Sequence, residues 1–583
     1  MTQRASTMAK DSVMSRLRMF GRDEKGSLIV FSLILFVLMA MMGGIAVDLM
    51  RYESTRVQLQ QTLDRATLAA ASLDQTLDAE DVVADYFAKA GLSDKLKSVS
   101  VDEGVNFRTV TADAKAVSKN FFMHMVGIDS IDAPAASIAE QRITNVEIAL
   151  VLDISGSMYV TPSRIANLKV AAKDFVDTVL AKDTQNKISI SIVPYNGQVN
   201  LGPDLFGKFN VGNLVNPVVK AEHYCLDLPS SVYSSTSLSR STSFPQVPFA
   251  DAFSSTTQGS GYTNLQGPTI DGRNLYSNMW CQPGSANYVR VHSNNISLLK
   301  TQIDGMVAVG ATSIDLGLKW GVTLLDPATR GIVSELVTSG KVQSQFSGRP
   351  ANYDDPETLK VVVLMTDGEH FAAERFNDAY RSGNTNGIWR SNADGTFSIF
   401  HASKVVSTSA TTICNSRPYW VPSIGSTGAW HSRPWNGTVP VTTACYVPTT
   451  TTYSGSTAQT WQQVWAVART QWVAWQLYAR ALGGTSPTQG QVFATWMANF
   501  RTTDATSSMD TRLDQLCETS KEKGILIYGI AFEAPTHGID VVKGCANTPA
   551  STYFFDVKAD GKISIKTAFR LIASNISQLR LTQ

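Results

Sequence analysis

The chain of 583 residues carries 50 Lys and Arg against 49 Asp and Glu, which gives a formal net charge of +1. Such an even balance excludes the strongly basic character of general nucleic-acid-binding proteins, so we expect no nucleic-acid partner. Hydrophobic residues make up 43% of the chain and charged residues 17%, a composition that excludes disorder as the dominant state.

The first predicted element is a membrane helix. Residues 27–47 form an apolar run without a charge, and about 20 apolar residues are enough to span a bilayer as an α-helix. Residues 1–26 are rich in Lys and Arg, so the positive-inside rule predicts a cytoplasmic tail there and export of everything after Asp48. A cleaved signal peptide is the alternative. Its apolar core would normally be shorter, at about 7–15 residues, so we expect the helix to be retained.

A small α+β region is predicted to follow, over residues 48–142. Apolar side chains spaced by four and three residues indicate that the helix continues with one apolar seam. We expect this seam to pack against the chain's own strands rather than in a coiled coil with another subunit. Residues 97–142 alternate in strand fashion, and a long helix followed by strands is a pilin-like layout. The seam consists of Leu59, Leu63, Ala66, Ala70, Leu73 and Leu77.

Polar side chains follow a predicted buried strand, Val146–Leu152. The sequence continues as Asp153-Ile-Ser155-Gly-Ser157, and residues 165–180 then carry apolar side chains at helical spacing. In open α/β sheets, ligands bind at the carboxyl ends of the strands, where this loop lies. One carboxylate and two hydroxyls suit a hard cation such as Mg²⁺, but three oxygen ligands are too few to hold it. Further ligands must come from elsewhere in the chain.

Two later segments place oxygen ligands at comparable positions. Thr312 lies in a loop that precedes a helical pattern, Leu316–Trp320. Asp367 comes shortly after a second predicted buried strand, Lys360–Met365. Because strands and helices alternate along this part of the chain, we predict a mostly parallel central sheet covered by helices on both faces. The three loops are then expected to meet at one edge of that sheet.

Asp153-x-Ser155-x-Ser157, together with Thr312 and Asp367, resembles the metal-ion-dependent adhesion site of von Willebrand factor A (vWA) domains, which have a Rossmann-like α/β fold. The resemblance implies that these five side chains hold Mg²⁺ or Mn²⁺, directly or through water. Two carboxylates leave a divalent cation with little net charge, so an acidic group of a protein partner can fill an open coordination position. The resemblance implies binding without chemical turnover, and we therefore expect no enzyme activity.

Three motifs surround the membrane helix, namely Glu24-Lys-Gly26, Ala46-Val-Asp48 and Leu63-Asp-Arg-Ala-Thr-Leu-Ala-Ala-Ala71. They resemble the TadE/TadG-like segment of tight-adherence (Flp) pilus assembly proteins, and Ile576–Thr582 is similar to the ends of TadG-like chains. The resemblance covers roughly residues 20–200, 300–370 and 510–583. It implies a bacterial inner-membrane protein with a periplasmic vWA domain over residues 143–583, which serves pilus biogenesis or surface attachment.

Two long stretches, residues 201–300 and 370–510, interrupt the vWA pattern, and we predict that they are insertions with structure of their own. All six cysteines follow the membrane helix, which fits disulfides in an oxidising compartment. We predict sequential pairing, with one pair inside each insertion, and buried free thiols are the alternative. The predicted pairs are Cys225–Cys281, Cys414–Cys445 and Cys517–Cys545.

Aromatic and histidine side chains in the second insertion allow further interpretations. Trp461, Trp465, Trp472 and Trp475 share one helical face, which we interpret as the core of an inserted subdomain rather than a platform for sugars. His370 lies three residues after Asp367, and we predict that it is a surface loop residue rather than a catalytic base. No G-x-S-x-G, H-E-x-x-H or G-x-x-x-x-G-K-[ST] motif occurs in the sequence.

Three functions follow from the sequence as hypotheses. The leading one is a membrane-tethered binding or assembly module of the pilus machinery, with a protein partner that offers an acidic group. Its rival is a surface adhesin whose insertions recognise glycans or matrix. A metal-assisted hydrolase is a remote third, because the sequence contains a metal-binding pattern but none of the catalytic motifs named above.

Overall fold

The computed structural model describes residues 25–582 apart from a set of stretches between them. The chain divides into two compact units, Met1–Ile143 with Leu581–Gln583 and Thr144–Arg580. The predicted cytoplasmic tail, residues 1–26, lies almost wholly outside the described residues. Residues outside the description are 1–24, 73–74, 76, 104–106, 143–144, 182, 184, 213–222, 248–264, 266–268, 271–274, 277–280, 356, 407–411, 423, 425–426, 439–444, 449–450, 559–562 and 583.

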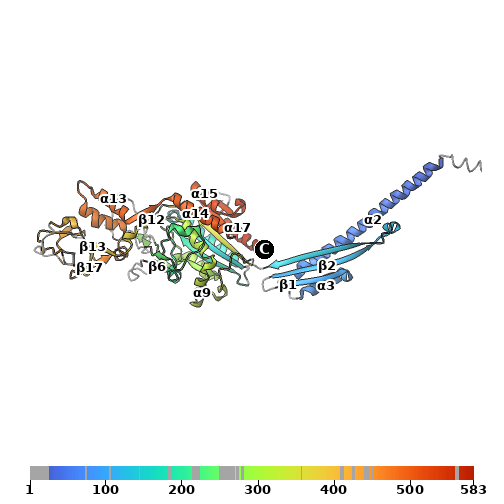
Figure 1. The fold of residues 1–583 in the computed structure, drawn as a ribbon, viewed down its shortest axis with the longest axis horizontal. Coiled ribbons are helices and arrows are strands. Elements are labelled where there is room, and N and C mark those ends of the chain that lie inside the picture. The colour runs from blue at the N-terminus through green and yellow to red at the C-terminus, as the bar shows by residue number, and fades with distance from the viewer. Residues whose placement is uncertain are drawn as a thin grey trace, which may run out of the picture. The chain divides into compact units, whose positions relative to one another are not determined.

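The first unit consists of a long helix and a three-stranded antiparallel sheet (Figure 1). Helix α2 (Lys25–Ala70) is followed by the short helix α3 (Ala79–Lys89). The strands are β1 (Leu96–Glu103), β2 (Phe107–Lys119) and β3 (Ser130–Arg142), in the order β1-β2-β3. Helix α2 meets the predicted length and composition of a membrane span, with a mean hydropathy of 2.7 and 6% burial in its apolar window. Signal sequences share this property.

The second half of α2 packs against the unit's own sheet, as the seam predicts. Leu59, Leu63, Ala66 and Ala70 are buried together with small strand residues such as Ala112 and Ala133. Small side chains on both partners let the helix approach the sheet closely. The packing on strands is therefore confirmed for these four seam positions.

The predicted continuation of the helix beyond residue 70 is wrong. Helix α2 ends at Ala70, and Leu77 lies beyond it with 64% of its surface exposed, whereas Leu73 is outside the described residues. Arg108 of β2 donates from Nη1 to the carbonyl oxygens of Ala70 at 3.5 Å and Ser72 at 3.0 Å. Helix-terminal carbonyls need such partners, and a side chain far along the chain provides one here.

The second unit is built on a six-stranded sheet in the order β10-β5-β4-β11-β19-β20. Four of its five pairings are parallel, and only β10 runs antiparallel, to β5. The other sheets of the described chain are antiparallel apart from the short pair β6 (Asn210–Gly212) and β7 (Ser243–Pro245), so the chain as a whole is mixed α/β. The strands are β4 (Asn145–Asp153), β5 (Ile188–Tyr195), β10 (Arg290–Ser293), β11 (Thr358–Thr366), β19 (Leu526–Phe532) and β20 (Phe554–Val557).

Two hydrophobic cores cover the two faces of this sheet, because successive strand residues point to opposite sides. On β4, Ile148 and Leu150 face one core, which includes side chains of α5 (Pro162–Leu180), α7 (Ile296–Gly305) and α17 (Ile565–Thr582). Ala149 and Val151 face the other core, with α8 (Ile314–Thr323), α9 (Arg330–Thr338) and α14 (Thr506–Glu522). The expected helices on both faces are thus present.

The second predicted insertion forms a subdomain whose hydrophobic core also includes Cys225, Val247 and Cys281 of the first insertion. Its five-stranded antiparallel sheet has the order β16-β15-β14-β13-β17. A separate antiparallel pair, β12 (Ala373–Phe376) with β18 (Arg501–Asp504), joins the two ends of the insertion. Trp461, Trp465 and Trp472 are buried in its core and Trp475 is partly buried against it, which confirms the interpretation of these aromatics as core residues. The single helical face is wrong, because residues 466–469 interrupt the helix. The sheet strands are β13 (Asn384–Ser391), β14 (Phe397–Phe400), β15 (Tyr419–Val421), β16 (Ala429–His431) and β17 (Ser456–Thr460).

The predicted end of the first insertion, at residue 300, lies too far along the chain. Strand β10 (Arg290–Ser293) belongs to the central sheet, and α7 packs on one face of that sheet. Residues 290–300 are therefore part of the domain framework rather than of an insertion. Much of the remaining stretch, 213–222 and most of 248–280, lies outside the described residues.

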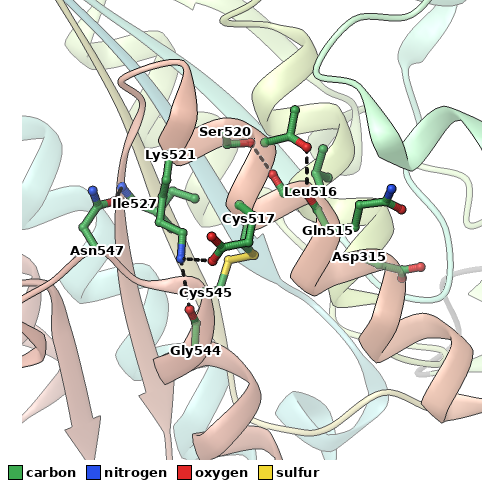
Figure 2. Close-up of a disulfide and its surroundings, with 12 residues drawn as sticks. Asp315, Gln515, Leu516, Cys517, Ser520, Lys521, Ile527, Gly544, Cys545 and Asn547 are labelled. Carbon is green, nitrogen blue, oxygen red and sulfur yellow. Dashed lines mark hydrogen bonds and ion pairs between the residues drawn. A yellow bond between two sulfur atoms is a disulfide. The ribbon is translucent and has the colours of Figure 1, made fainter.

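Three disulfides join the cysteines in sequential order, as predicted. Cys225–Cys281 lies within the first insertion and Cys414–Cys445 within the second. The third, Cys517–Cys545, connects α14 to the end of α15 (Thr536–Cys545) (Figure 2). Beside it, Lys521 Nζ donates to the carbonyl oxygen of Gly544 at 3.3 Å, which adds a second link between these helices.

Candidate metal centre

The two predicted carboxylates lie at the same edge of the central sheet. Asp153 is the last residue of β4, and Asp367 directly follows β11. These strands are parallel neighbours with Leu152 paired to Met365, so both carboxyl ends reach the same level. Thr366, which the sequence reasoning did not single out, donates from Oγ1 to Asp153 Oδ2 at 2.7 Å and links the two strand ends.

The Asp-x-Ser-x-Ser loop turns sharply at this edge. The Ser155 N–H donates to Asp153 Oδ1 at 2.8 Å, and the hydroxyls of Ser155 and Ser157 lie 3.0 Å apart. Gly156 N–H donates to the carbonyl oxygen of Gly310 at 2.9 Å. A Cβ at Gly156 would lie 3.0 Å from that oxygen, so a side chain there would force the two loops apart.

Asp367 joins the first loop from the other side. Ser157 Oγ donates to Asp367 Oδ1 at 2.6 Å, and Arg164 of α5 donates from Nη1 to Asp367 Oδ2 at 2.9 Å. Arg164 also donates from Nε to Glu533 Oε2 at 2.8 Å, just after β19. The sequence reasoning missed Arg164, because nothing in its local pattern shows that α5 directs it toward a strand end 203 residues away.

Thr312 completes the group from the loop before α8. It is 7% exposed, and its carbonyl oxygen accepts the N–H of Phe371 at 2.9 Å, which holds the loop beside the segment after β11. A Cβ built at Gly368 would lie 3.7 Å from Thr312 Oγ1 and 3.8 Å from Ser157 Oγ. All five predicted side chains therefore gather at one place in the second unit.

His370 differs from its predicted surface position. Its side chain is buried, and Nε2 accepts the N–H of Asp315 at 3.1 Å while Nδ1 lies 2.8 Å from Asp510 Oδ1. Accepting at Nε2 leaves the proton of a neutral imidazole on Nδ1, where it is donated to Asp510. His370 thus fixes the first turn of α8, next to Thr312, against α14.

Burial and like charge set the electrostatics of the centre. Burial, followed by the neighbouring Asp367, raises the pKa of Asp153 to about 7, against the opposing effect of its hydrogen bonds. Burial also raises the pKa of Asp367, although Ser157 and Arg164 act in the opposite direction. Two buried carboxylates that disfavour each other's charge are stabilised by a cation between them.

The residues fit a hard divalent cation by their chemistry. Mg²⁺ prefers oxygen ligands, and this group offers two carboxylates and three hydroxyls. Among the described residues, no cluster of three or more His, Cys, Asp or Glu side chains suited to a metal occurs, so any metal here would depend on the hydroxyls. Each of the four carboxylate oxygens already accepts one hydrogen bond, so a metal would use their remaining lone pairs together with the hydroxyls.

The carboxylate pair gives the metal-free domain a testable pH dependence. Since the pKa of Asp153 lies at about 7 in the fold against an ordinary value of 3.8, the folded state holds a proton that the unfolded state releases between these values. The contribution of Asp153 to the free energy of unfolding should therefore fall as pH rises through this window. Thermal unfolding in chelator should show a steeper decline for the parent than for Asp153→Asn, and parallel curves would contradict the expectation.

Comparison with known proteins identifies a family for the N-terminal segment. Residues 26–73 match the family described as putative Flp pilus-assembly TadE/G-like. The resemblance to TadE/G-like proteins predicted from the sequence is confirmed over this segment. A comparison of the sequence with curated proteins finds no match.

Several solved structures with some likeness are pilus proteins. The vWF domain of the type V pili tip protein Mfa5 from Porphyromonas gingivalis has 11% identity and a TM-score of 0.30, and the alignment covers 76% of this chain and 98% of that one. The tip pilin GBS104 from Group B Streptococcus agalactiae has 11% identity and a TM-score of 0.29, over 75% and 100%. The von Willebrand factor type A protein from Catenulispora acidiphila has 11% identity and a TM-score of 0.15, over 47% and 34%. These TM-scores are too low to carry an argument.

Proposed function

We propose that this chain, whose residues 26–73 are TadE/G-like, is a membrane-anchored vWA-type binding module of the Flp/Tad pilus machinery. In this proposal, α2 anchors the chain in the bacterial inner membrane, with its N-terminus in the cytoplasm. Residues 143–583 form the vWA domain in the periplasm. The domain binds an acidic group of a protein partner through Mg²⁺ or Mn²⁺ and carries out no chemical turnover.

The observation that supports this proposal most strongly is the gathering of five oxygen-bearing side chains at one sheet edge. They come from three segments, and their order along the chain is that of the vWA metal site. Asp153 and Asp367 would supply the carboxylates, and Ser155, Ser157 and Thr312 the hydroxyls. When bound, the cation would supply positive charge for a partner's carboxylate, while Thr366 and Arg164 hold the two aspartates in place.

The disulfides and the apolar helix both support the proposed periplasmic location of the second unit. All three pairs lie in the second unit, after the apolar helix, and disulfides persist in oxidising compartments such as the bacterial periplasm. The apolar part of α2 leaves large side chains exposed from Leu28 to Met50, which suits lipid contact. A retained helix and an exported domain account for both features.

The two rival functions receive less support. An adhesin for glycans would use exposed aromatic rings, yet Trp461, Trp465 and Trp472 serve the subdomain core. A hydrolase would need a base near the metal, yet His370 is engaged by Asp510 and by the N–H of Asp315. We therefore favour a binding role without catalysis.

Capture of envelope proteins tests the proposed function. The full-length chain is immobilised in lipid nanodiscs and exposed to the detergent-extracted envelope proteins of its own source, with Mg²⁺ or with chelator. We expect one or more pilus components to be retained with Mg²⁺ and lost with chelator, because the metal would bridge the partner's carboxylate to Asp153 and Asp367.

Two variants make this result specific. Asp367→Ala should abolish retention, whereas Glu369→Ala should leave it unchanged, because Glu369 is exposed two residues away. Retention that survives both chelator and Asp367→Ala would rule out metal-bridged binding.

A further inference from the structure

The turn between β2 and β3 exposes an unusual amount of apolar surface. Contiguous apolar patches on monomeric proteins in water are small, and larger ones mark contacts with proteins or membranes. This turn, residues 120–129, has five large hydrophobic side chains that face outward from a single short segment. They are Phe121 (68% exposed), Phe122 (43%), Met125 (72%), Val126 (49%) and Ile128 (42%).

The turn is held firmly against the membrane helix. The carboxylate of Asp48 in α2 accepts the backbone N–H groups of Phe121, Phe122 and Met123, at 3.1, 2.7 and 2.8 Å. One buried side chain thus satisfies three successive donors, which fixes both the position and the shape of the turn. Figure 1 shows β2 running beside α2 within this unit.

Further contacts place the turn beside the last part of the apolar run. The ring of Phe122 lies so close to Gly44 that a Cβ there would be 2.3 Å from it, so only glycine permits this contact. The guanidinium of Arg51 lies 4.6 Å from the centre of the Phe121 ring. The turn is therefore level with residues 44–51 of α2, where the predicted membrane span ends.

Exposed apolar side chains of the helix lie at the same level as the turn. Val47, Leu49 and Met50 are about half or more exposed at the same level of α2. Polar groups accompany the patch, since His124 Nδ1 lies 2.5 Å from Asp129 Oδ1 and both side chains are exposed. Aromatic rings and a cation next to apolar side chains are typical of the membrane–water interface.

We propose that the β2–β3 turn, residues 120–129, inserts into the lipid interface on the side of the membrane where α2 emerges. This inference rests on the membrane anchoring in the proposed function and goes beyond it. A single helix would leave the exported part free to tilt and rotate about its axis. A second contact, fixed to the helix by Asp48, orients the first unit relative to the bilayer.

A matched position on the same hairpin lies away from the proposed interface. Ile138 of β3 is 71% exposed, close to the 72% of Met125. It pairs with Thr111, whereas the turn is closed by the pair Lys119 and Ser130. Ile138 lies eight positions after Ser130, which corresponds to about 26 Å along the strand. Ile138 is therefore expected to face water.

Depth-dependent fluorescence quenching tests the insertion. All six native cysteines are in disulfides, so an introduced cysteine can be labelled selectively with an environment-sensitive dye. Met125→Cys, Ile138→Cys and Leu38→Cys are prepared in the full-length chain. Each is reconstituted into phosphatidylethanolamine and phosphatidylglycerol vesicles that contain spin-labelled lipid. We expect a blue shift and several-fold stronger quenching for Met125→Cys than for Ile138→Cys.

The label at Leu38, within the apolar run of α2, distinguishes failure of the inserted turn from failure of the membrane anchor. Quenching at Leu38 without quenching at Met125 would overturn the inserted turn, leave the anchor intact and redirect the patch toward a protein partner. Absence of quenching at both positions would overturn the anchoring itself. Equal quenching at Met125 and Ile138 would also overturn the proposal, because it would reflect adsorption of the dye rather than the position of the turn.

Discussion

Asp153→Ala is expected to lower the affinity of the full-length chain for Mg²⁺ by about 100-fold or more. Loss of groups that only orient metal ligands already costs roughly 10–100-fold. Asp153 would contribute one of only two carboxylates, and its two oxygens are held by the N–H of Ser155 and the hydroxyl of Thr366. Isothermal titration of Mg²⁺ into protein purified in chelator measures the change.

Stability separates loss of the site from loss of the fold. Removing Asp153 takes away a buried charge that Asp367 disfavours, but it also removes the acceptor of the Ser155 N–H and the Thr366 hydroxyl. Because these effects oppose each other, the variant should still unfold cooperatively in chelator, at a temperature close to that of the parent. Thr366→Val removes only the hydrogen bond that positions Asp153, and a smaller loss, of roughly 10-fold, is expected.

The exposed Glu369 provides the local control, and Glu369→Ala should bind Mg²⁺ as the parent does. Unchanged affinity in Asp153→Ala would show that no metal binds in the predicted way.

The location of the site could be predicted because parallel strands constrain it. Each aspartate was expected at or just after the end of a buried apolar run, and parallel pairing brings such ends to one edge. The observed pairing of Leu152 with Met365 places Asp153 and Asp367 at the same level. For Thr312 the signal was weaker, since its loop follows no strand and only precedes a helical pattern, and the family pattern completed that assignment.

The features that could not be predicted depend on partners distant in sequence. Helix α2 ends at Ala70, where Arg108 of β2 donates to the carbonyl oxygens of Ala70 and Ser72, and no local breaker marks that end. Strand β10 has only four residues and joins the sheet as an antiparallel edge. Such a short run does not show enough alternation to be distinguished from a loop in the sequence. His370 is buried only because α8 and α14 both supply it with partners.

A buried ion pair near the amino-terminal ends of β4 and β11 gives the largest expected effect on stability. Lys360 of β11 donates from Nζ to Glu147 Oε2 of β4 at 2.5 Å, with side chains that are 4% and 0% exposed. Breaking such a pair by removing one partner leaves an uncompensated buried charge, which typically costs about 3–5 kcal/mol. Lys360→Met is therefore expected to lower the free energy of unfolding of the second unit by about that amount. Denaturant titration under non-reducing conditions, followed by tryptophan fluorescence, measures it.

A double variant tests whether the unpaired charge is the cause. Glu147 Oε1 also accepts the N–H of Ala351 at 2.8 Å, and Glu147→Gln keeps a carbonyl oxygen for that bond. Lys360→Met combined with Glu147→Gln should recover most of the lost stability, because no buried charge remains. Lys300→Met serves as the surface control, since its pair with Asp177 is 36% and 49% exposed and such pairs contribute about 0–1 kcal/mol. If Lys360→Met costs no more than Lys300→Met, the carboxylate of Glu147 does not depend on Lys360 for its stabilisation in the fold.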